Sequence, residues 1–144
     1  MTTHEYLNQI YRLQEKITSL TLYEERLRCE AERVSAPPFD KIRVSGSAPR
    51  DTSAVMAKLA DCEAELVRTR MEMIMKRDKI VKEIQELGDE DSHYVELLTR
   101  RYVLFEQYSD IAKKMRYTET HVFRLRKAAL AAFEEKYGGE YADA

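Results

Sequence analysis

The sequence has no tryptophan, only four glycines and three prolines, and no long apolar run. The scarcity of glycine and proline argues against the many tight turns of a β-sandwich or barrel. Without a long apolar run, we expect neither a membrane span nor a signal peptide. Cys29 and Cys62 form no C-x-x-C pair and have no ligand spacing to histidine. We therefore expect reduced thiols, no metal, no cofactor and a cytoplasmic protein.

Charged residues are abundant but nearly balanced, since 24 Lys and Arg face 26 Asp and Glu. This balance excludes a chain that coats nucleic acid indiscriminately. Carboxylates alternate with basic residues, as at Lys82-Glu83, and we expect them on solvated helix faces. His4, His93 and His121 share no metal motif, and no glycine-rich phosphate loop is present. We therefore do not expect an enzyme.

Two long helical segments are expected before residue 88. A capping box at Thr2 and Glu5 begins the first segment, and Pro37 and Pro38 end it. Apolar residues recur at spacings of four and three in both, which predicts an antiparallel, coiled-coil-like hairpin. The expected seam is Tyr6, Ile10, Leu13, Ile17, Leu20, Glu24, Leu27, Ala31 and Val34 in the first, and Val55, Leu59, Cys62, Leu66, Met73, Ile80 and Leu87 in the second. Met56, Val67, Met71, Ile74, Val81 and Ile84 widen the second face, so the hairpin is expected to form a homo-oligomer or bind a partner.

Residues 35–52 carry the proline, glycine and serine of a long loop. Phe39, Ile42 and Val44 could hold this loop against the helices, and binding a partner is the functional alternative to simple connection. Gly88 and the polar residues 89–92 indicate a domain boundary. The predicted domains are the hairpin, residues 1–88, and a second helical domain, residues 89–144.

The second domain has the pattern of a helix-turn-helix. One helix is expected to end near Tyr102, a two-turn helix to begin at Ser109, and a longer helix to follow Thr118 as its N-cap. Ile111, Ala112 and Met115 share one face of the short helix, and Val122, Leu125, Ala129 and Phe133 form the buried stripe of the longer helix. The fold class is therefore all-α, a long helical hairpin followed by a helix-turn-helix bundle.

The opposite face of the longer helix is polar. Nine basic and six acidic residues between positions 92 and 137 leave a surplus of only three positive charges. Such a surplus supports few phosphate contacts, so useful affinity for DNA is expected to need dimerisation or a DNA-bound partner such as RNA polymerase. Five side chains are expected on this face, where they could read base edges in double-stranded DNA: Glu119, Thr120, His121, Arg124 and Lys127.

The pattern of these helices resembles the fourth region of bacterial sigma factors, which recognises the promoter −35 element. The resemblance is carried by Leu97, Arg101-Tyr102-Val103, Tyr108-Ser109, Ile111-Ala112, Met115, Thr118, Val122, Arg126 and Ala129-Leu130. With the long helices and the loop residues Ser45-Gly46 and Pro49-Arg50-Asp51, the layout is similar to the ArpU-like late-gene regulators of phages and prophages.

This resemblance implies a protein of the bacterial cytoplasm that binds promoter DNA and controls transcription. It places Glu119, Thr120, His121 and Arg124 where the sigma region touches bases, and Glu and Arg can pair with cytosine and guanine. The implied phosphate contacts are Arg100, Arg101, Ser109, Lys113, Lys114, Arg116, Thr118 and Arg126.

Three functions are compatible with the sequence. The first is a transcription regulator that recognises a promoter and contacts RNA polymerase. The second is a small terminase subunit of phage DNA packaging, which would assemble as a ring. The third is an interaction protein that occupies the polymerase without reading DNA, with the C-terminal helices forming a plain three-helix bundle.

Overall fold

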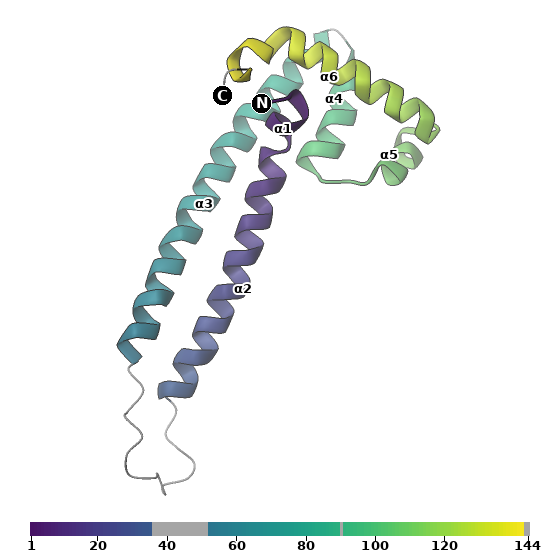
Figure 1. The fold of residues 1–144 in the computed structure, drawn as a ribbon. Coiled ribbons are helices and arrows are strands. Elements are labelled where there is room, and N and C mark those ends of the chain that lie inside the picture. The colour runs from purple at the N-terminus through teal and green to yellow at the C-terminus, as the bar shows by residue number, and fades with distance from the viewer. Residues whose placement is uncertain (36–51, 90, 143–144) are drawn as a thin grey trace, which may run out of the picture. The chain divides into compact units, whose positions relative to one another are not determined.

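The computed structural model describes residues 1–35, 52–89 and 91–142. Within these ranges the fold is all-α, as predicted, and its helices follow in the order shown in Figure 1. Most of the predicted loop 35–52, with Phe39, Ile42, Val44 and the Ser45 to Asp51 motif, lies outside the described residues. The helices are α1 (Thr3–Leu7), α2 (Gln9–Ser35), α3 (Thr52–Glu86), α4 (Ser92–Leu98), α5 (Tyr108–Met115) and α6 (Glu119–Tyr141), with a 3₁₀ turn η1 (Leu87–Asp89) and a π-helical segment η2 (Thr99–Val103).

The first helix begins at the predicted capping box. The Thr2 hydroxyl accepts a hydrogen bond from the Glu5 amide, and the Glu5 carboxylate accepts one from the Thr2 amide. These two bonds satisfy amides that an isolated helix end would leave without partners. The chain continues into α2 with only a one-residue interruption at Asn8.

The described chain divides into two compact units, which are residues 15–71 and residues 1–14 with 72–144. The sequence predicted a boundary at residue 88 instead. The units divide elsewhere because the start of the chain and the end of α3 share a core with the C-terminal helices. Tyr6, Leu7, Ile80 and Ile84 are buried in the same cluster as Phe133.

The unit of residues 15–71 consists of parts of α2 and α3 that run side by side in opposite directions (Figure 1). Ile17, Leu27, Leu59 and Leu66 are buried there, at the predicted seam positions. Ion pairs join the two helices at Lys16–Glu65, with 2.8 Å between nitrogen and oxygen, and at Arg28–Glu63, with 3.3 Å. Both pairs are solvent-exposed, so the apolar seam supplies most of the packing energy.

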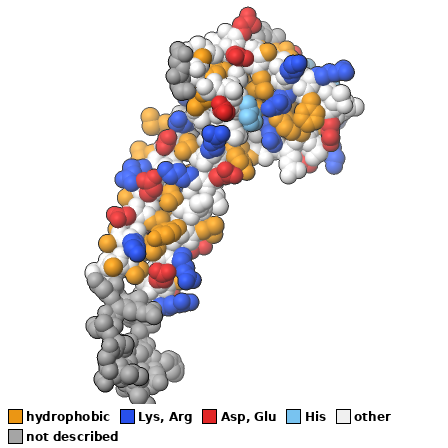
Figure 2. All heavy atoms as spheres, viewed as in Figure 1, with side chains coloured by type: hydrophobic (Ala, Val, Ile, Leu, Met, Phe, Trp, Pro, Cys, Tyr) orange, Lys and Arg blue, Asp and Glu red, His pale blue; other side chains and the backbone are white. Residues whose placement is uncertain are grey.

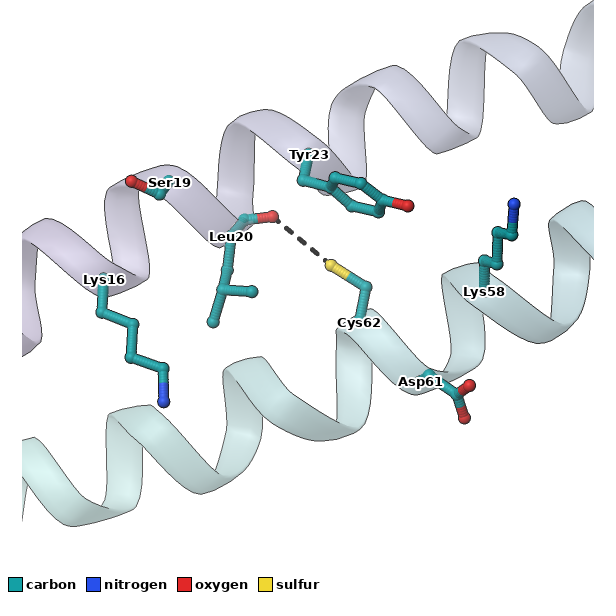
Figure 3. A pocket seen from close by; sticks show the side chains of 7 residues that line it. All are labelled: Lys16, Ser19, Leu20, Tyr23, Lys58, Asp61 and Cys62. Carbon is teal, nitrogen blue, oxygen red and sulfur yellow. Dashed lines mark hydrogen bonds between the residues drawn. The ribbon is translucent and has the colours of Figure 1, made fainter.

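A groove of about 560 Å³ lies between the same two helix segments (Figure 3). Its lining includes Leu20, Tyr23 and Cys62, and the Cys62 thiol points to the Leu20 carbonyl oxygen at 3.4 Å. Burial raises the pKa of the Cys62 thiol, and Glu24 and Glu63 raise it further. The thiolate is the reactive form of cysteine, and a raised pKa disfavours it. We therefore interpret Cys62 as a packing residue. Cys29 and Cys62 are both free cysteines.

In the other unit, α6 packs against α1, α4 and α5. Phe133 and Ala129 are fully buried against the end of α3, and the ring of Tyr6 stacks on that of Tyr141 with centroids 4.4 Å apart. This core fixes the position of α6, which carries the predicted base-reading side chains.

One predicted solvated carboxylate is buried, and that expectation was wrong. Glu83 is only 7% exposed, and its Oε1 accepts a hydrogen bond of 2.6 Å from the hydroxyl of Tyr6. Its Oε2 is buried without a partner among the described residues. Burial raises the pKa of Glu83, although the hydrogen bond from Tyr6 acts in the opposite direction. The local pattern Lys82-Glu83 could not reveal this, because Tyr6 lies 77 positions away.

Candidate nucleic-acid interface

A tight turn joins α5 to α6. Ile111 and Ala112 of α5 and Val122 of α6 are buried together with Leu97 of α4. The turn is closed by Arg116, whose φ of 61° and ψ of 41° are left-handed, and by the hydrogen bond of 2.9 Å from the Tyr117 amide to the Ala112 carbonyl. An L-residue with a side chain pays an energetic penalty for this conformation, so Arg116 strains the turn locally.

Thr118 is the N-cap of α6, as predicted. Its hydroxyl accepts a hydrogen bond of 3.2 Å from the His121 amide. Because this oxygen accepts the His121 amide, Thr118 fixes the start of α6, and its hydroxyl proton can still be donated to a ligand. The same capping geometry directs the first turn of α6, with Glu119, Thr120 and His121, into solvent.

The five predicted base-contacting residues are all exposed. In the predicted stripe behind them, Val122, Ala129 and Phe133 are buried, whereas Leu125 is only half-buried. Thr120, Arg124 and Lys127 follow at spacings of four and three and therefore share one face of α6. No ion pair joins Arg124 or Lys127 to another residue in the described ranges. His121 differs, because its ring packs edge-on against Tyr117 with centroids 4.3 Å apart.

The predicted phosphate-contacting residues divide into two groups. Lys113 and Arg116 are exposed and make no ion pair within the described part of the chain. Arg100 and Lys114 instead pair with Glu106, and Arg100 also pairs with Glu96. The hydrogen bonds from Lys114 and Arg100 lower the pKa of the Glu106 carboxyl. The charges of Arg100 and Lys114 are therefore largely balanced inside the protein.

Two further predicted cations lie against an aromatic ring. The guanidinium of Arg101 is 4.3 Å from the ring centre of Tyr108, and that of Arg126 is 5.7 Å from the same centre. Arg101 also donates a hydrogen bond of 2.9 Å to the Glu106 carbonyl. Ser109, another predicted phosphate contact, is half-buried at the start of α5. These residues border the exposed face of α6 rather than forming its centre.

Sequence reasoning missed the residues from outside this segment that complete the region. His4 of α1 lies beside Arg126, with 3.5 Å between His4 Nδ1 and Arg126 Nη2. Glu106 was also missed as an internal counter-ion. A pairing between positions 4 and 126 has no local signal in the sequence, since periodicity reports only neighbours along one helix.

The exposed surface of this unit is mixed in charge. Figure 2 shows Lys and Arg side chains near the α5 and α6 end, interspersed with apolar and acidic side chains. Phe123, 49% exposed, packs on Tyr108 with ring centroids 4.9 Å apart. The described residues contain no cluster of His, Cys, Asp and Glu that could hold a metal ion. Among them, no helix has both the length and the apolar character needed to span a bilayer.

A model of the family described as "protein of unknown function (DUF1492)" matches residues 33–134. The chain belongs to the DUF1492 family. The matched region contains α3, α4, α5 and most of α6, so the candidate interface lies inside the part that the DUF1492 family shares. The matched region does not include α1, which contains His4. No curated protein and no solved structure matches the chain.

Proposed function

We propose that this protein is a phage-type transcription regulator that binds promoter DNA through a helix-turn-helix formed by α5 and α6. The observation that carries the proposal is the exposed face of α6, where Thr120, Arg124 and Lys127 stand in a row. A row of this spacing follows one side of a helix and suits the major groove, where Arg pairs with guanine. The N-cap at Thr118 holds the start of this row in place.

Phosphate contacts come from residues beside that row. Lys113 and Arg116 are solvated and have no carboxylate partner among the described residues, so their charges are available to a DNA backbone. Two such contacts give weak binding by themselves. We propose that a second copy of the chain and contact with RNA polymerase at the promoter supply the additional DNA affinity.

Self-association is supported by one face of α3. Met56, Ala60, Val67 and Met71 share this face and are exposed, with exposed fractions of 52%, 55% and 59% for Met56, Val67 and Met71. When two copies pair antiparallel, Met56 of each meets Met71 of the other, and Ala60 meets Val67. We therefore propose a homodimer with a two-fold axis near residue 64.

The charges beside this face suit the same pairing. One flank carries Asp61 and Arg68, and the other carries Glu63 and Arg70; inside the hairpin, Glu63 also pairs with Arg28, and Arg68 with Glu65. In the antiparallel register, Arg68 of one copy lies opposite residues 59–60 of the other, within one helical turn of Asp61, so this arginine comes close to this acid. A parallel partner would place like charges together.

The size of the assembly is tested by light scattering coupled to gel filtration. We expect a dimer for the full chain, a monomer for Met71→Asp, and an unchanged dimer for Ala54→Asp, which adds the same charge outside the apolar face. A monomeric wild-type protein would refute the homodimer. A ring of eight or more copies would favour the packaging subunit over the regulator.

DNA binding is tested by salt titration on fragments from upstream of the neighbouring genes. We expect Arg124→Ala to abolish the preference for one fragment, because Arg124 reads bases. We expect Lys113→Ala to weaken binding to all fragments and to make the salt dependence shallower by about one contact. Lys82→Ala on α3 removes the same charge outside the interface and is expected to leave both properties unchanged.

The proposal fails if folded wild-type protein binds none of the fragments at low salt. In that case the interaction protein becomes the better interpretation, and binding to purified RNA polymerase would be measured. Under that interpretation, polymerase binding should be unaffected by Arg124→Ala.

A further inference from the structure

A cavity of about 410 Å³ lies beside the candidate interface, within the unit formed by residues 1–14 and 72–144. Its lining is mainly polar and comes from three parts of the chain, which are α1 with the start of α2, η2, and the segment before α5. The lining residues are His4, Asn8, Tyr11, Arg101, Phe105 and Gln107.

The charge around this cavity is positive and uncompensated. Arg101 lines it, and Arg126 adjoins it through the 3.5 Å contact with His4. Neither arginine has a carboxylate partner among the described residues, although both guanidinium groups lie over the ring of Tyr108. Two like charges on one ring repel each other, so a bound anion would stabilise the arrangement.

One hydrogen-bond donor in this region is left without an acceptor. The Nε atom of Arg126 is buried and has no partner among the described residues. Arg101 uses one of its guanidinium nitrogens for the Glu106 carbonyl, and its remaining N–H groups are available. The amides of Asn8 and Gln107 add neutral donors at the cavity wall. The lining can therefore present several donors at once, from Arg101 and from the amide NH2 groups of Asn8 and Gln107, which fits an acceptor-only ligand such as phosphate.

Part of the cavity lining is aromatic, and one of its residues has a strained backbone. Phe105 has a φ of 60°, which is unusual for a bulky residue, and its ring meets that of Tyr11 edge-on with centroids 5.4 Å apart. The strained turn at Phe105 directly precedes Glu106 and Gln107. It therefore positions the Glu106 carbonyl, which accepts a hydrogen bond from Arg101. Strained residues of this kind are concentrated at functional sites.

We propose that this cavity is a phosphate site that receives one backbone phosphate of the DNA bound by α6. This inference rests on the proposed function, and it extends the interface to α1, which lies outside the matched family region. Arg101 supplies the direct charge, and Arg126 adds charge from behind His4. Asn8 and Gln107 complete the site as neutral donors. Since phosphates carry no sequence information, the site adds affinity and register but no base preference.

The first test replaces Asn8 by Asp in the full chain, which places a carboxylate in the cavity. We expect DNA affinity to fall about tenfold and the salt dependence to lose about one phosphate contact, with the preference among fragments unchanged. Gln85→Glu, on α3 and outside the cavity lining, adds the same charge and is expected to leave the salt dependence unchanged. Urea unfolding of both variants verifies that they fold.

The second test uses inorganic phosphate without DNA and follows the His4 ring signals by NMR. We expect saturable shifts in the wild type and in Gln85→Glu but not in Asn8→Asp. Wild-type protein that binds DNA with a salt dependence unaffected by Asn8→Asp would overturn the phosphate site and leave the proposed function intact. If the protein binds no DNA, the proposed function fails, and saturable phosphate shifts would then identify a site for free phosphate instead of a DNA contact.

Discussion

The Nδ1 atom of His4 lies 2.8 Å from the hydroxyl oxygen of Tyr102, although 98 positions separate the two residues. Partial burial lowers the pKa of His4, and the charges of Arg126 and Arg101 lower it further. These effects favour the neutral form of His4, and the arginines supply the positive charge of the cavity. The contact also fixes α1 beside η2, so the start of the chain contributes to the region next to the candidate interface.

Glu83 is expected to make folding stability depend on pH. Its pKa is raised in the folded protein above that of the unfolded chain, so the folded state binds more protons between these two values. Its contribution is therefore fully present below the unfolded pKa and decreases as pH rises through the folded pKa. We expect wild type to lose stability relative to Glu83→Gln as the pH rises from below the ordinary glutamate pKa to neutral pH, as measured by urea unfolding.

The matched control for this prediction is Glu72→Gln, a substitution on the same helix with an exposed side chain. It removes the same charge without relieving a buried carboxylate. A constant difference between wild type and Glu83→Gln across this pH range would contradict the burial of a charged Glu83.

The Arg116→Gly variant is expected to be at least as stable as the wild type. Glycine has no side chain to oppose the left-handed backbone at this position, so Arg116→Gly should raise the free energy of unfolding by up to about 1 kcal/mol. Arg116→Ala removes the same cation but keeps Cβ, and should give no such gain. Both should weaken DNA binding equally. Equal unfolding midpoints for the two variants would contradict the strain.

Thr118 and Thr120 are expected to differ although they stand two positions apart. Thr118→Ala should lower the free energy of unfolding by about 1 kcal/mol, because the His121 amide loses its acceptor. Thr118→Ser should restore most of the loss. Because Thr120 is exposed, Thr120→Ala should leave the free energy of unfolding unchanged. It should weaken DNA binding, because Thr120 lies on the face of α6 proposed to read bases. Thermal unfolding and DNA titration of the same three variants test this division. A Thr118→Ala protein as stable as the wild type would refute the capping role.

Glu106 is expected to restrain DNA binding. Its carboxylate balances Arg100 and Lys114, so Glu106→Gln should release positive charge beside α5. We expect tighter DNA binding and a steeper salt dependence by about one contact. Glu134→Gln on α6 provides the same charge change without affecting these two cations. Unchanged salt dependence in Glu106→Gln would place Arg100 and Lys114 away from the DNA backbone.

The sequence by itself determined the local features of this protein. Thr2 and Glu5, three residues apart, predicted the capping box, and Thr118 predicted the start of α6. The spacing of Ile111, Ala112 and Val122 predicted which faces are buried. These predictions succeed because a cap or a helix face involves residues within a few positions of one another. The exposure of Arg124 and Lys127 follows from the same periodicity, whereas their role in DNA binding stays a prediction.

Only the tertiary structure decided which distant residues meet. It buried Glu83 against Tyr6, balanced Lys114 with Glu106 across eight positions, and brought His4 beside Arg126. Such contacts depend on how helices pack, and a charged side chain has the same sequence signature whether it is solvated or paired. The hydrophobic core around Phe133 is the physical cause, because it draws the first turns of the chain onto α6 and thereby assembles the cationic cavity.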